Sequence, residues 1–233
     1  MEPLEPKDDK SNWSPPKPHL DVGMAPEGVN AKRVQGRRLT GPQQGFGKLW
    51  QKTYKVAIPN QTPQQVISTW KAEYGRFWPS NNKFYAPVAG IQPGEIGLIK
   101  SSTGPVPLST GVLVLYSDDV SFSYMTPEGH PFAGFITFSS HVEEPVGTMA
   151  QVQLLIRAND AAYEAGMMLF GSKAEDRMWE HTLRSLADYL GSSSPVDTNV
   201  ICVDQKRLWK NFNNLRYNGA LPWARRSKTR QVN

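Results

Sequence analysis

The residue best suited to chemistry is His130, within the segment Thr126-Pro127-Glu128-Gly129-His130-Pro131. Its glycine and prolines are typical of a turn. A neutral imidazole can donate or accept a hydrogen bond, or take up a proton near pH 7. Three interpretations stay open: a structural turn residue fixed by Gly129 and Pro131, a ligand contact, or a general base. The structural interpretation is favoured, so no catalytic residue is assigned.

Other residues of suitable type do not form a recognised motif. A metal site would have to use His130, His141, Glu143 and Glu144, whose spacing matches no known ligand set. His181 is not part of a His-Glu-x-x-His sequence, and no Gly-x-Ser-x-Gly segment is present. The sequence therefore predicts neither a metal site nor a cofactor.

The elements expected to hold His130 are strands. Four runs between residues 110 and 158 have strand character, either by alternating apolar and polar residues or by a short β-branched-rich apolar run bounded by turns. The runs are residues 111–116, 120–125, 135–142 and 150–158. Their order predicts an antiparallel meander with one solvated face and one face that needs a cover. Further strands are expected at residues 49–58, 84–88 and 95–100.

Two helices are expected to flank this sheet. The first begins at Thr62, where Pro63 and Gln65 complete a capping-box pattern. The second is a long C-terminal helix that begins near Ser172, and it is predicted to place Glu175 on the solvent side. Its apolar stripe consists of Met178, Trp179, Thr182, Leu183, Leu186, Tyr189 and Leu190.

Composition limits the class of protein. With 233 residues and 39% apolar content the chain can form one domain with a substantial core. The single cysteine, Cys202, excludes an intramolecular disulfide, and no apolar leader follows Met1, so a cytoplasmic location is expected. No apolar run approaches the roughly 18 residues that an integral membrane helix requires.

Charge is concentrated at the C-terminal end. Residues 205–233 contain eight of the 26 basic residues and no acidic residue, so the 21 acidic residues outnumber the basic ones in the remainder. We therefore expect no nucleic-acid binding by the domain. Leu208, Phe212 and Leu215 recur at helical spacing and predict a short basic amphipathic helix. It could dock on its own domain, which is favoured, or on an anionic membrane surface, a protein partner or a nucleic acid.

Three segments follow from these patterns. Residues 1–44 contain seven prolines and little apolar periodicity, which predicts a disordered or extended N-terminal arm. Residues 45–191 form the predicted domain. Residues 192–233 are predicted to be a linker, starting at Gly191-Ser192-Ser193-Ser194-Pro195, and a basic C-terminal tail.

The order of these elements resembles the helix-grip fold of START domains, birch-pollen-allergen-like proteins and polyketide cyclases, the SRPBCC superfamily. Residues 122–131 with Gly134 are similar to the Gly-His-Pro segment of a bacterial family within it whose domain has no assigned function. Two features of that family are missing, because Phe135-Ile136 replaces paired acidic residues and Ser109-Thr110-Gly111 replaces a Cys-Arg pair. Roles that depend on those polar groups are therefore not carried over.

This resemblance implies an α+β fold in which a curved antiparallel sheet wraps around a long C-terminal helix. It also implies a cavity for an apolar or amphipathic small molecule, without a built-in cofactor. The residues expected to contact that molecule are aromatic residues with polar tips, together with the turn histidine: Tyr85, Tyr116, Tyr124, Trp179 and His130. The same aromatic residues could instead fill the core.

The resulting hypothesis is a protein that binds such a molecule and presents it or shields it from water. One alternative is a cyclase- or hydrolase-like enzyme in which His130 is the base and Tyr124 orients the substrate. A second alternative is an interaction module that acts through the N-terminal arm and the basic tail.

Overall fold

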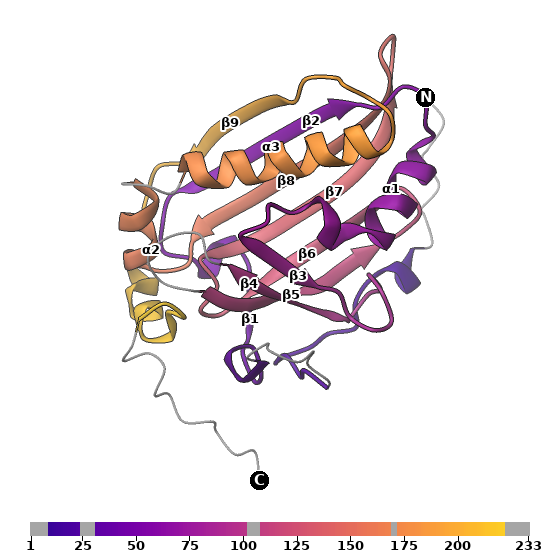
Figure 1. Cartoon of the computed structure of the whole chain (residues 1–233). Coiled ribbons are helices and arrows are strands. Elements are labelled where there is room, and N and C mark those ends of the chain that lie inside the picture. Colours follow the sequence, from indigo (N-terminus) through magenta and orange to yellow (C-terminus); the bar gives the residue numbers. More distant parts are fainter. Residues whose placement is uncertain (1–8, 24–30, 102–107, 169–171, 222–233) are drawn as a thin grey trace, which may run out of the picture.

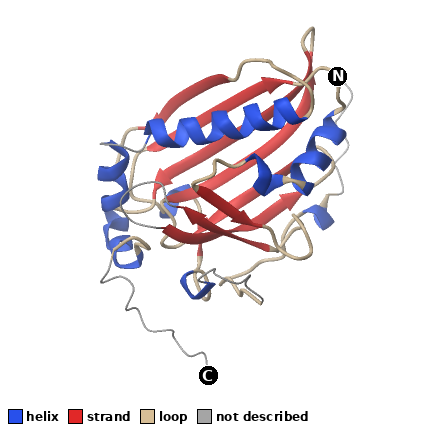
Figure 2. Ribbon diagram, in the orientation of Figure 1, coloured by secondary structure: helices blue, strands red, loops and turns tan. Residues whose placement is uncertain are grey.

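The computed structural model describes residues 9–23, 31–101, 108–168 and 172–221. It is an α+β protein in which one curved, nine-stranded antiparallel sheet wraps around the helix α3 (Figures 1 and 2). The strands follow the order β3-β4-β5-β6-β7-β8-β2-β9, and β1 pairs with β6 outside this path. The predicted helix-grip arrangement is therefore confirmed.

The bounds of the strands are β1 Leu39–Thr40, β2 Leu49–Ala57, β3 Asn82–Tyr85, β4 Ile96–Ser101, β5 Leu108–Ser117, β6 Ser121–Pro127, β7 Phe132–Glu143, β8 Gly147–Ala158 and β9 Asp197–Asp204. The helices are α1 Pro63–Ala72, α2 Ala161–Gly166 and α3 Ser172–Tyr189, with 3₁₀ segments that include η4 Tyr74–Phe77 and η6 Trp209–Tyr217. No described helix is both long enough and apolar enough to cross a bilayer.

The predicted meander corresponds to β5 through β8. The pairing of β7 with β8 runs from Phe132 opposite Ala158 to Glu143 opposite Gly147. Alternate residues of each strand point to the same face, so Val152 and Leu154 of β8 lie on the concave side with Phe138 of β7. This concave side carries the main hydrophobic core.

Helix α1 begins as predicted and fills one half of the concave face. Thr62 Oγ1 accepts from Gln65 N at 3.2 Å, and Gln65 Oε1 accepts from Thr62 N at 2.8 Å, which completes the capping box. Trp70 is fully buried, and its ring meets those of Phe138 at 5.2 Å and Phe122 at 6.0 Å between centroids. Both contacts are edge-on, a favourable geometry for aromatic pairs.

Helix α3 covers the other half of the concave face. Trp179, Leu183 and Leu186 are buried against the sheet, as the apolar stripe predicted. The expectation that Glu175 faces solvent is wrong, because Lys52 on the inner face of β2 brings a positive charge into the core beneath it. Lys52 Nζ lies 2.8 Å from Glu175 Oε2. The side chain of Ser172, where this helix begins, lies outside the described ones.

The described parts of the N-terminal arm are extended and packed on the convex face of the sheet. Leu20 and Val34 are buried with Leu98 and Leu113 in a second, smaller cluster. Leu39 pairs with Pro127 in the contact between β1 and β6. These parts of the arm therefore pack on the sheet, although they show little apolar periodicity.

The segment predicted as a linker contains β9, which pairs with β2 at the edge of the sheet. This prediction is wrong for Asp197–Asp204, because an edge strand exposed on both faces does not need an alternating pattern. The buried guanidinium of Arg157 holds its end, donating to Asp204 Oδ2 at 2.6 Å and to the carbonyls of Gly47 at 2.6 Å and Lys206 at 2.8 Å. The division into three segments at residues 44 and 191 stays a prediction.

The predicted amphipathic helix is the 3₁₀ segment η6. Asn211 donates to the carbonyls of Gln43 at 3.0 Å and Gly45 at 2.7 Å, and Asn214 donates to that of Asn159 at 2.9 Å. A 3₁₀ helix aligns every third residue, so these asparagines face the domain. Phe212, which the α-helical period placed on the docking face, is exposed.

Candidate ligand-binding cavity

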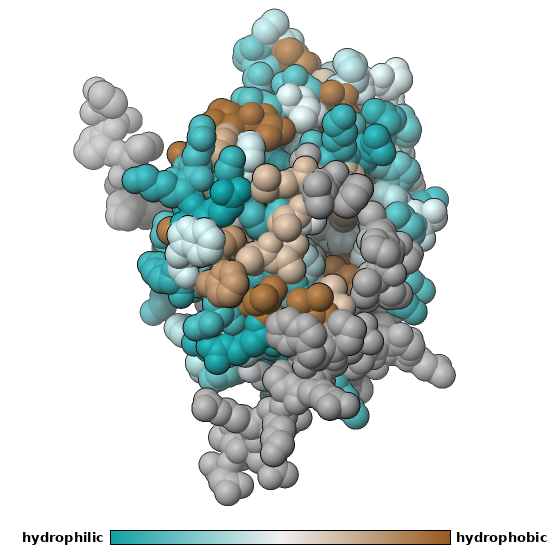
Figure 3. All heavy atoms as spheres, turned by 90° about the vertical axis from the view of Figure 1, so that its left-hand side faces the viewer, coloured by the Kyte–Doolittle hydropathy of each residue, from teal (hydrophilic) through white to brown (hydrophobic). Residues whose placement is uncertain are grey.

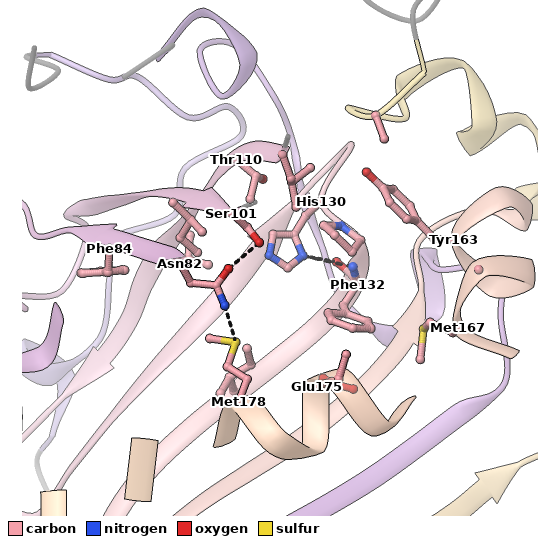
Figure 4. Close-up of a pocket in the computed structure, with 18 of the residues that line it drawn as sticks. Asn82, Phe84, Ser101, Thr110, His130, Phe132, Tyr163, Met167, Glu175 and Met178 are labelled. Carbon is pink, nitrogen blue, oxygen red and sulfur yellow. Dashed lines mark hydrogen bonds between the residues drawn. The ribbon is translucent and has the colours of Figure 1, made fainter. Parts of the chain in front are cut away.

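A cavity of about 530 Å³ lies between the sheet and the first half of α3. Its walls come from β3 to β7, from α2 and α3, and from the chain that follows η6. Figure 4 shows side chains from these elements converging on it. The volume falls within the range of about 300–1,000 Å³ that is usual for small-molecule sites.

Most of the wall is aromatic or aliphatic. Val112 and Ile136 contribute from β5 and β7, and Met178 and Trp179 contribute from α3. Side chains of this kind favour an apolar ligand, because contact with them removes apolar surface from water. Ala174 is small and fills little of the space beneath the start of α3.

One end of the cavity is closed by an aromatic cluster. The ring of Phe84 lies 4.6 Å from that of Tyr74 and stacks on that of Tyr124 at 5.8 Å between centroids. Trp78 meets Trp179 edge-on at 6.4 Å. Tightly packed rings at this end leave the free volume on the side of α2 and η6.

The hydroxyl of Tyr124 is buried without a hydrogen-bond partner among the described residues. Burial raises the pKa of this hydroxyl, and the neighbouring Tyr74 adds to the effect. A buried polar group without a partner costs free energy, and such exceptions in a native protein call for an explanation.

His130 lies at the cavity wall in the turn between β6 and β7. Gly129 precedes it with φ +83°, and a Cβ there would stand 2.5 Å from the carbonyl oxygen of Tyr217, so the turn packs closely on the end of η6. The side chain of His130 is buried, and its Nδ1 lies 3.0 Å from the backbone nitrogen of Phe132. Burial lowers the pKa of the imidazole to about 4, so the ring is neutral at pH 7.

A small polar group shares this part of the wall. Ser101 Oγ donates to Asn82 Oδ1, and Asn82 Nδ2 donates to Met178 Sδ at 3.6 Å. Thr110 of β5 is buried and lines the same cavity. In Figure 4 these polar side chains lie on the side of the imidazole away from Phe132.

Glu175 lines the cavity from α3, and it is part of a buried charged network. Lys52 Nζ contacts Glu175 Oε2 at 2.8 Å and Asp176 Oδ1 at 2.7 Å, while Tyr54 donates its hydroxyl to the same Asp176 oxygen at 2.6 Å. Burial raises the pKa of Glu175, although Lys52 opposes this effect. Glu175 Oε1 and the indole nitrogen of Trp179 are both buried without a hydrogen-bond partner among the described residues.

Of the five residues predicted to contact a ligand, Tyr124, His130 and Trp179 line the cavity. Tyr85 and Tyr116 do not. Tyr85 follows the inward-facing Phe84 and therefore points to the convex face, where it packs on the second cluster.

Tyr116 is displaced by an irregularity in the pairing of β5 with β6. The register shifts between Val114 and Tyr116, and the ring of Tyr116 packs on Trp13 at 4.7 Å between centroids. Its hydroxyl donates to Asp118 Oδ2 at 2.7 Å. A bulge of this kind changes which face a side chain occupies, and it has no signature in the alternating pattern.

Sequence reasoning missed several residues of the wall. Tyr74 and Trp78 were not among the predicted contacts, and Glu175 was expected in solvent. Tyr163 of α2 and Met167 beyond it also line the cavity. The aromatic spacing after Thr62 was visible in the sequence, whereas nothing in residues 160–170 distinguished a cavity wall from an ordinary helix.

Apart from His130, the residues considered for a metal lie away from the cavity. His141 Nε2 is 3.4 Å from Glu143 Oε2 at an exposed position of β7, and neither residue lines the cavity. Within the described ranges no three His, Cys, Asp or Glu side chains form a group that could hold a metal ion.

Comparison with known proteins gives similarity of fold only. No protein-family model and no curated protein matches the sequence. A START superfamily protein from Mycobacterium smegmatis is 18% identical with a TM-score of 0.45, over 62% of this chain and 97% of that one. Ara h 8.0201 is 10% identical with a TM-score of 0.44, over 61% of this chain and 97% of that one.

The di-domain ARO/CYC StfQ from the steffimycin biosynthetic pathway is 8% identical with a TM-score of 0.45, over 62% of this chain and 51% of that one. These similarities carry no information on a ligand. The narrower resemblance to the bacterial Gly-His-Pro family stays a prediction.

Proposed function

We propose that the protein binds an apolar or amphipathic small molecule in the cavity between the sheet and α3. The observation that carries this proposal is a pocket of about 530 Å³ with mainly apolar walls between the sheet and α3. Apolar surface that faces water in such a pocket is unfavourable, and an apolar ligand removes it from water. A ligand of matching shape would restore the missing contacts.

A fluorescence titration with 1-anilinonaphthalene-8-sulfonate tests this proposal. The substitution Ile136→Trp places a larger side chain in the cavity, while Leu113→Met alters the buried cluster on the convex face. We expect saturable binding to the wild type and to Leu113→Met, and at least about tenfold weaker binding to Ile136→Trp. Equal binding to all three proteins would show that the dye binds elsewhere and would contradict the proposal.

A second candidate function is contact with an anionic membrane surface through residues 205–221. Trp209 and Phe212 are 70% and 45% exposed and stack on each other at 6.1 Å between centroids. Lys206, Lys210 and Arg216 are exposed beside them, and residues 205–221 contain no acidic side chain. Exposed aromatic residues with flanking basic ones suit the headgroup region of an anionic bilayer.

The end of the molecule that carries α2 and η6 is shown in Figure 3, where hydrophobic side chains lie among polar ones. The same end contributes part of the cavity wall, since Asn218 and Leu221 line the cavity. A membrane contact here would bring the cavity close to a source of apolar molecules. We propose a cytoplasmic location, as expected from the sequence. The basic residues within 222–233 lie outside the described part of the chain.

Co-sedimentation with vesicles tests the second candidate. Vesicles of phosphatidylcholine are compared with vesicles in which a third of the lipid is phosphatidylserine. We expect binding to the anionic vesicles only, and its loss in the double variant Trp209→Ala/Phe212→Ala. Trp13→Ala removes another exposed tryptophan, 48% accessible on the convex face, and is the matched control. Binding that is unaffected by the double variant would overturn this candidate.

A further inference from the structure

The hydrogen bonds around His130 determine which ring nitrogen carries the proton. Nδ1 lies 3.0 Å from the backbone nitrogen of Phe132 and 3.1 Å from its carbonyl oxygen. The first contact requires a bare Nδ1 that accepts, and the second requires a protonated Nδ1 that donates. The two contacts therefore imply opposite tautomers.

The ladder between β7 and β8 decides between them. Asn159 N donates to Pro131 O at 2.9 Å, so the next pair, Phe132 opposite Ala158, falls at a position that is not hydrogen-bonded. The N–H of Phe132 thus turns away from β8 and toward the imidazole. A buried backbone donor must find an acceptor, whereas a carbonyl oxygen tolerates the loss of one bond more easily. Nδ1 is therefore the acceptor and the proton is on Nε2.

The Nε2–H group is left without a partner among the described residues. The described contacts of the ring nitrogens all involve Nδ1, and His130 is buried with only 7% of its surface accessible. The ring lines the cavity, and its low pKa, caused by burial, keeps it neutral at pH 7. A donor at the wall of the cavity is available to a molecule that enters it.

The surroundings of Nε2 define one polar patch in a mainly apolar cavity. Asn82, Ser101 and Thr110 lie on that side of the ring (Figure 4), and none of them carries a charge. The charged groups on the wall and behind it, Glu175 with Lys52 and Asp176, pair with one another. The patch therefore suits a neutral oxygen better than an anion.

We infer that the ligand of the cavity is a mainly apolar molecule with a neutral oxygen that accepts a hydrogen bond from His130 Nε2–H. A carbonyl oxygen is the preferred acceptor. This inference rests on the proposed ligand-binding function and names the chemical class of the ligand. It also changes the role of His130 in the enzyme alternative. A ring with a protonated Nε2 and an occupied Nδ1 acts as a donor toward a substrate and not as a base.

A matched pair of probes tests the inference: fluorenone, which carries a carbonyl, and fluorene, which carries a methylene group in its place. Both are titrated by displacement of the anilinonaphthalene dye from the full chain. We expect the wild type to bind fluorenone about tenfold more tightly than fluorene, the effect of one net hydrogen bond. His130→Asn keeps an acceptor near Phe132 N but lacks Nε2–H, so it should bind both probes equally.

His181→Asn, at an exposed position of α3, is the control and should keep the preference of the wild type. Equal affinities of the wild type for the two probes would overturn the inference while leaving the proposed function intact. If neither probe binds and the dye does not bind, the proposed function itself fails. Long-range ¹H–¹⁵N spectra of the histidine rings provide an independent reading, because a protonated Nδ1 in His130 would contradict the tautomer.

Discussion

The two halves of the concave face share the strands β6 and β7, yet one half is filled and the other is hollow. Beneath α1, Trp70 meets Phe122 and Phe138, and all three are fully buried. Beneath the first half of α3, the small Ala174 and the flexible Met178 leave a cavity of about 530 Å³. The covering helix, more than the sheet, therefore decides where space for a ligand remains.

The largest predicted effect is on the free energy of unfolding, when isoleucine is replaced by alanine in each of the two halves. Ile67 of α1 is fully buried in the filled half, and Ile136 of β7 lines the cavity. We expect Ile67→Ala to lower the free energy of unfolding by about 4 kcal/mol and Ile136→Ala by about 2 kcal/mol, because a side chain at a cavity loses fewer contacts. Urea unfolding measures both. Equal losses would mean that the cavity is filled by rearrangement in solution.

A second prediction concerns the charged network under α3. Lys52→Met leaves Glu175 and Asp176 side by side without a counter-charge, and we expect a loss of about 3 kcal/mol in unfolding free energy at pH 7. The loss should shrink as the pH falls through the pKa of Glu175, which burial raises, because protonation removes a buried charge. Urea unfolding at several pH values provides the measurement.

The matched control for that network is Lys55→Met. Lys55 pairs with Glu143 at 2.9 Å, and both side chains are substantially exposed. Exposed ion pairs contribute little, so the expected change is much smaller than that of Lys52→Met. A similar loss in the two variants would show that the network under α3 is not specially stabilising.

A third prediction uses the titration of His130. Its pKa in the folded protein is about 4, below the ordinary value of 6.5, so protonation favours the unfolded chain. The stability linked to this group is complete above pH 6.5 and is lost as the pH falls toward 4. At pH 4.5 the loss amounts to about 2 kcal/mol. The difference in unfolding free energy between wild type and His130→Asn should therefore decrease by that amount between pH 7 and pH 4.5. A constant difference would place His130 in solvent.

The smallest predicted effect concerns the hydroxyl of Tyr124 at the closed end of the cavity. Because this hydroxyl has no partner among the described residues, Tyr124→Phe should leave the stability unchanged or raise it by up to about 1 kcal/mol. Tyr54→Phe removes a hydroxyl that donates to Asp176 at 2.6 Å and should cost about 1–2 kcal/mol. Thermal unfolding of both variants distinguishes these outcomes, and equal losses would reveal a hidden partner of Tyr124.

Much of the framework could be predicted because its signals are local. The alternation in β6 and β8, the capping box at Thr62 and the apolar stripe of α3 each follow from residues close in sequence. They predicted the meander, the helices and the concave core. The resemblance to helix-grip proteins then supplied the arrangement and the expectation of a cavity.

The remaining features depend on contacts between distant residues. Glu175 is buried because Lys52, more than a hundred positions earlier, lies opposite it. Tyr116 leaves the cavity because of a register shift, and Tyr85 because its neighbour Phe84 takes the inward position. β9 forms against the edge of β2, and its β-branched run Val200-Ile201-Cys202-Val203 is a strand signal that was overlooked because it lies in the predicted linker.

The most direct test of the account is native mass spectrometry of the full chain purified from its own host, followed by denaturing extraction of any bound molecule. The account predicts a stoichiometric non-covalent adduct that releases a mainly apolar compound with a neutral oxygen, and it predicts loss of that adduct in Ile136→Trp. A wild-type protein that carries no such compound and binds neither the dye nor the two probes would contradict ligand binding in the cavity.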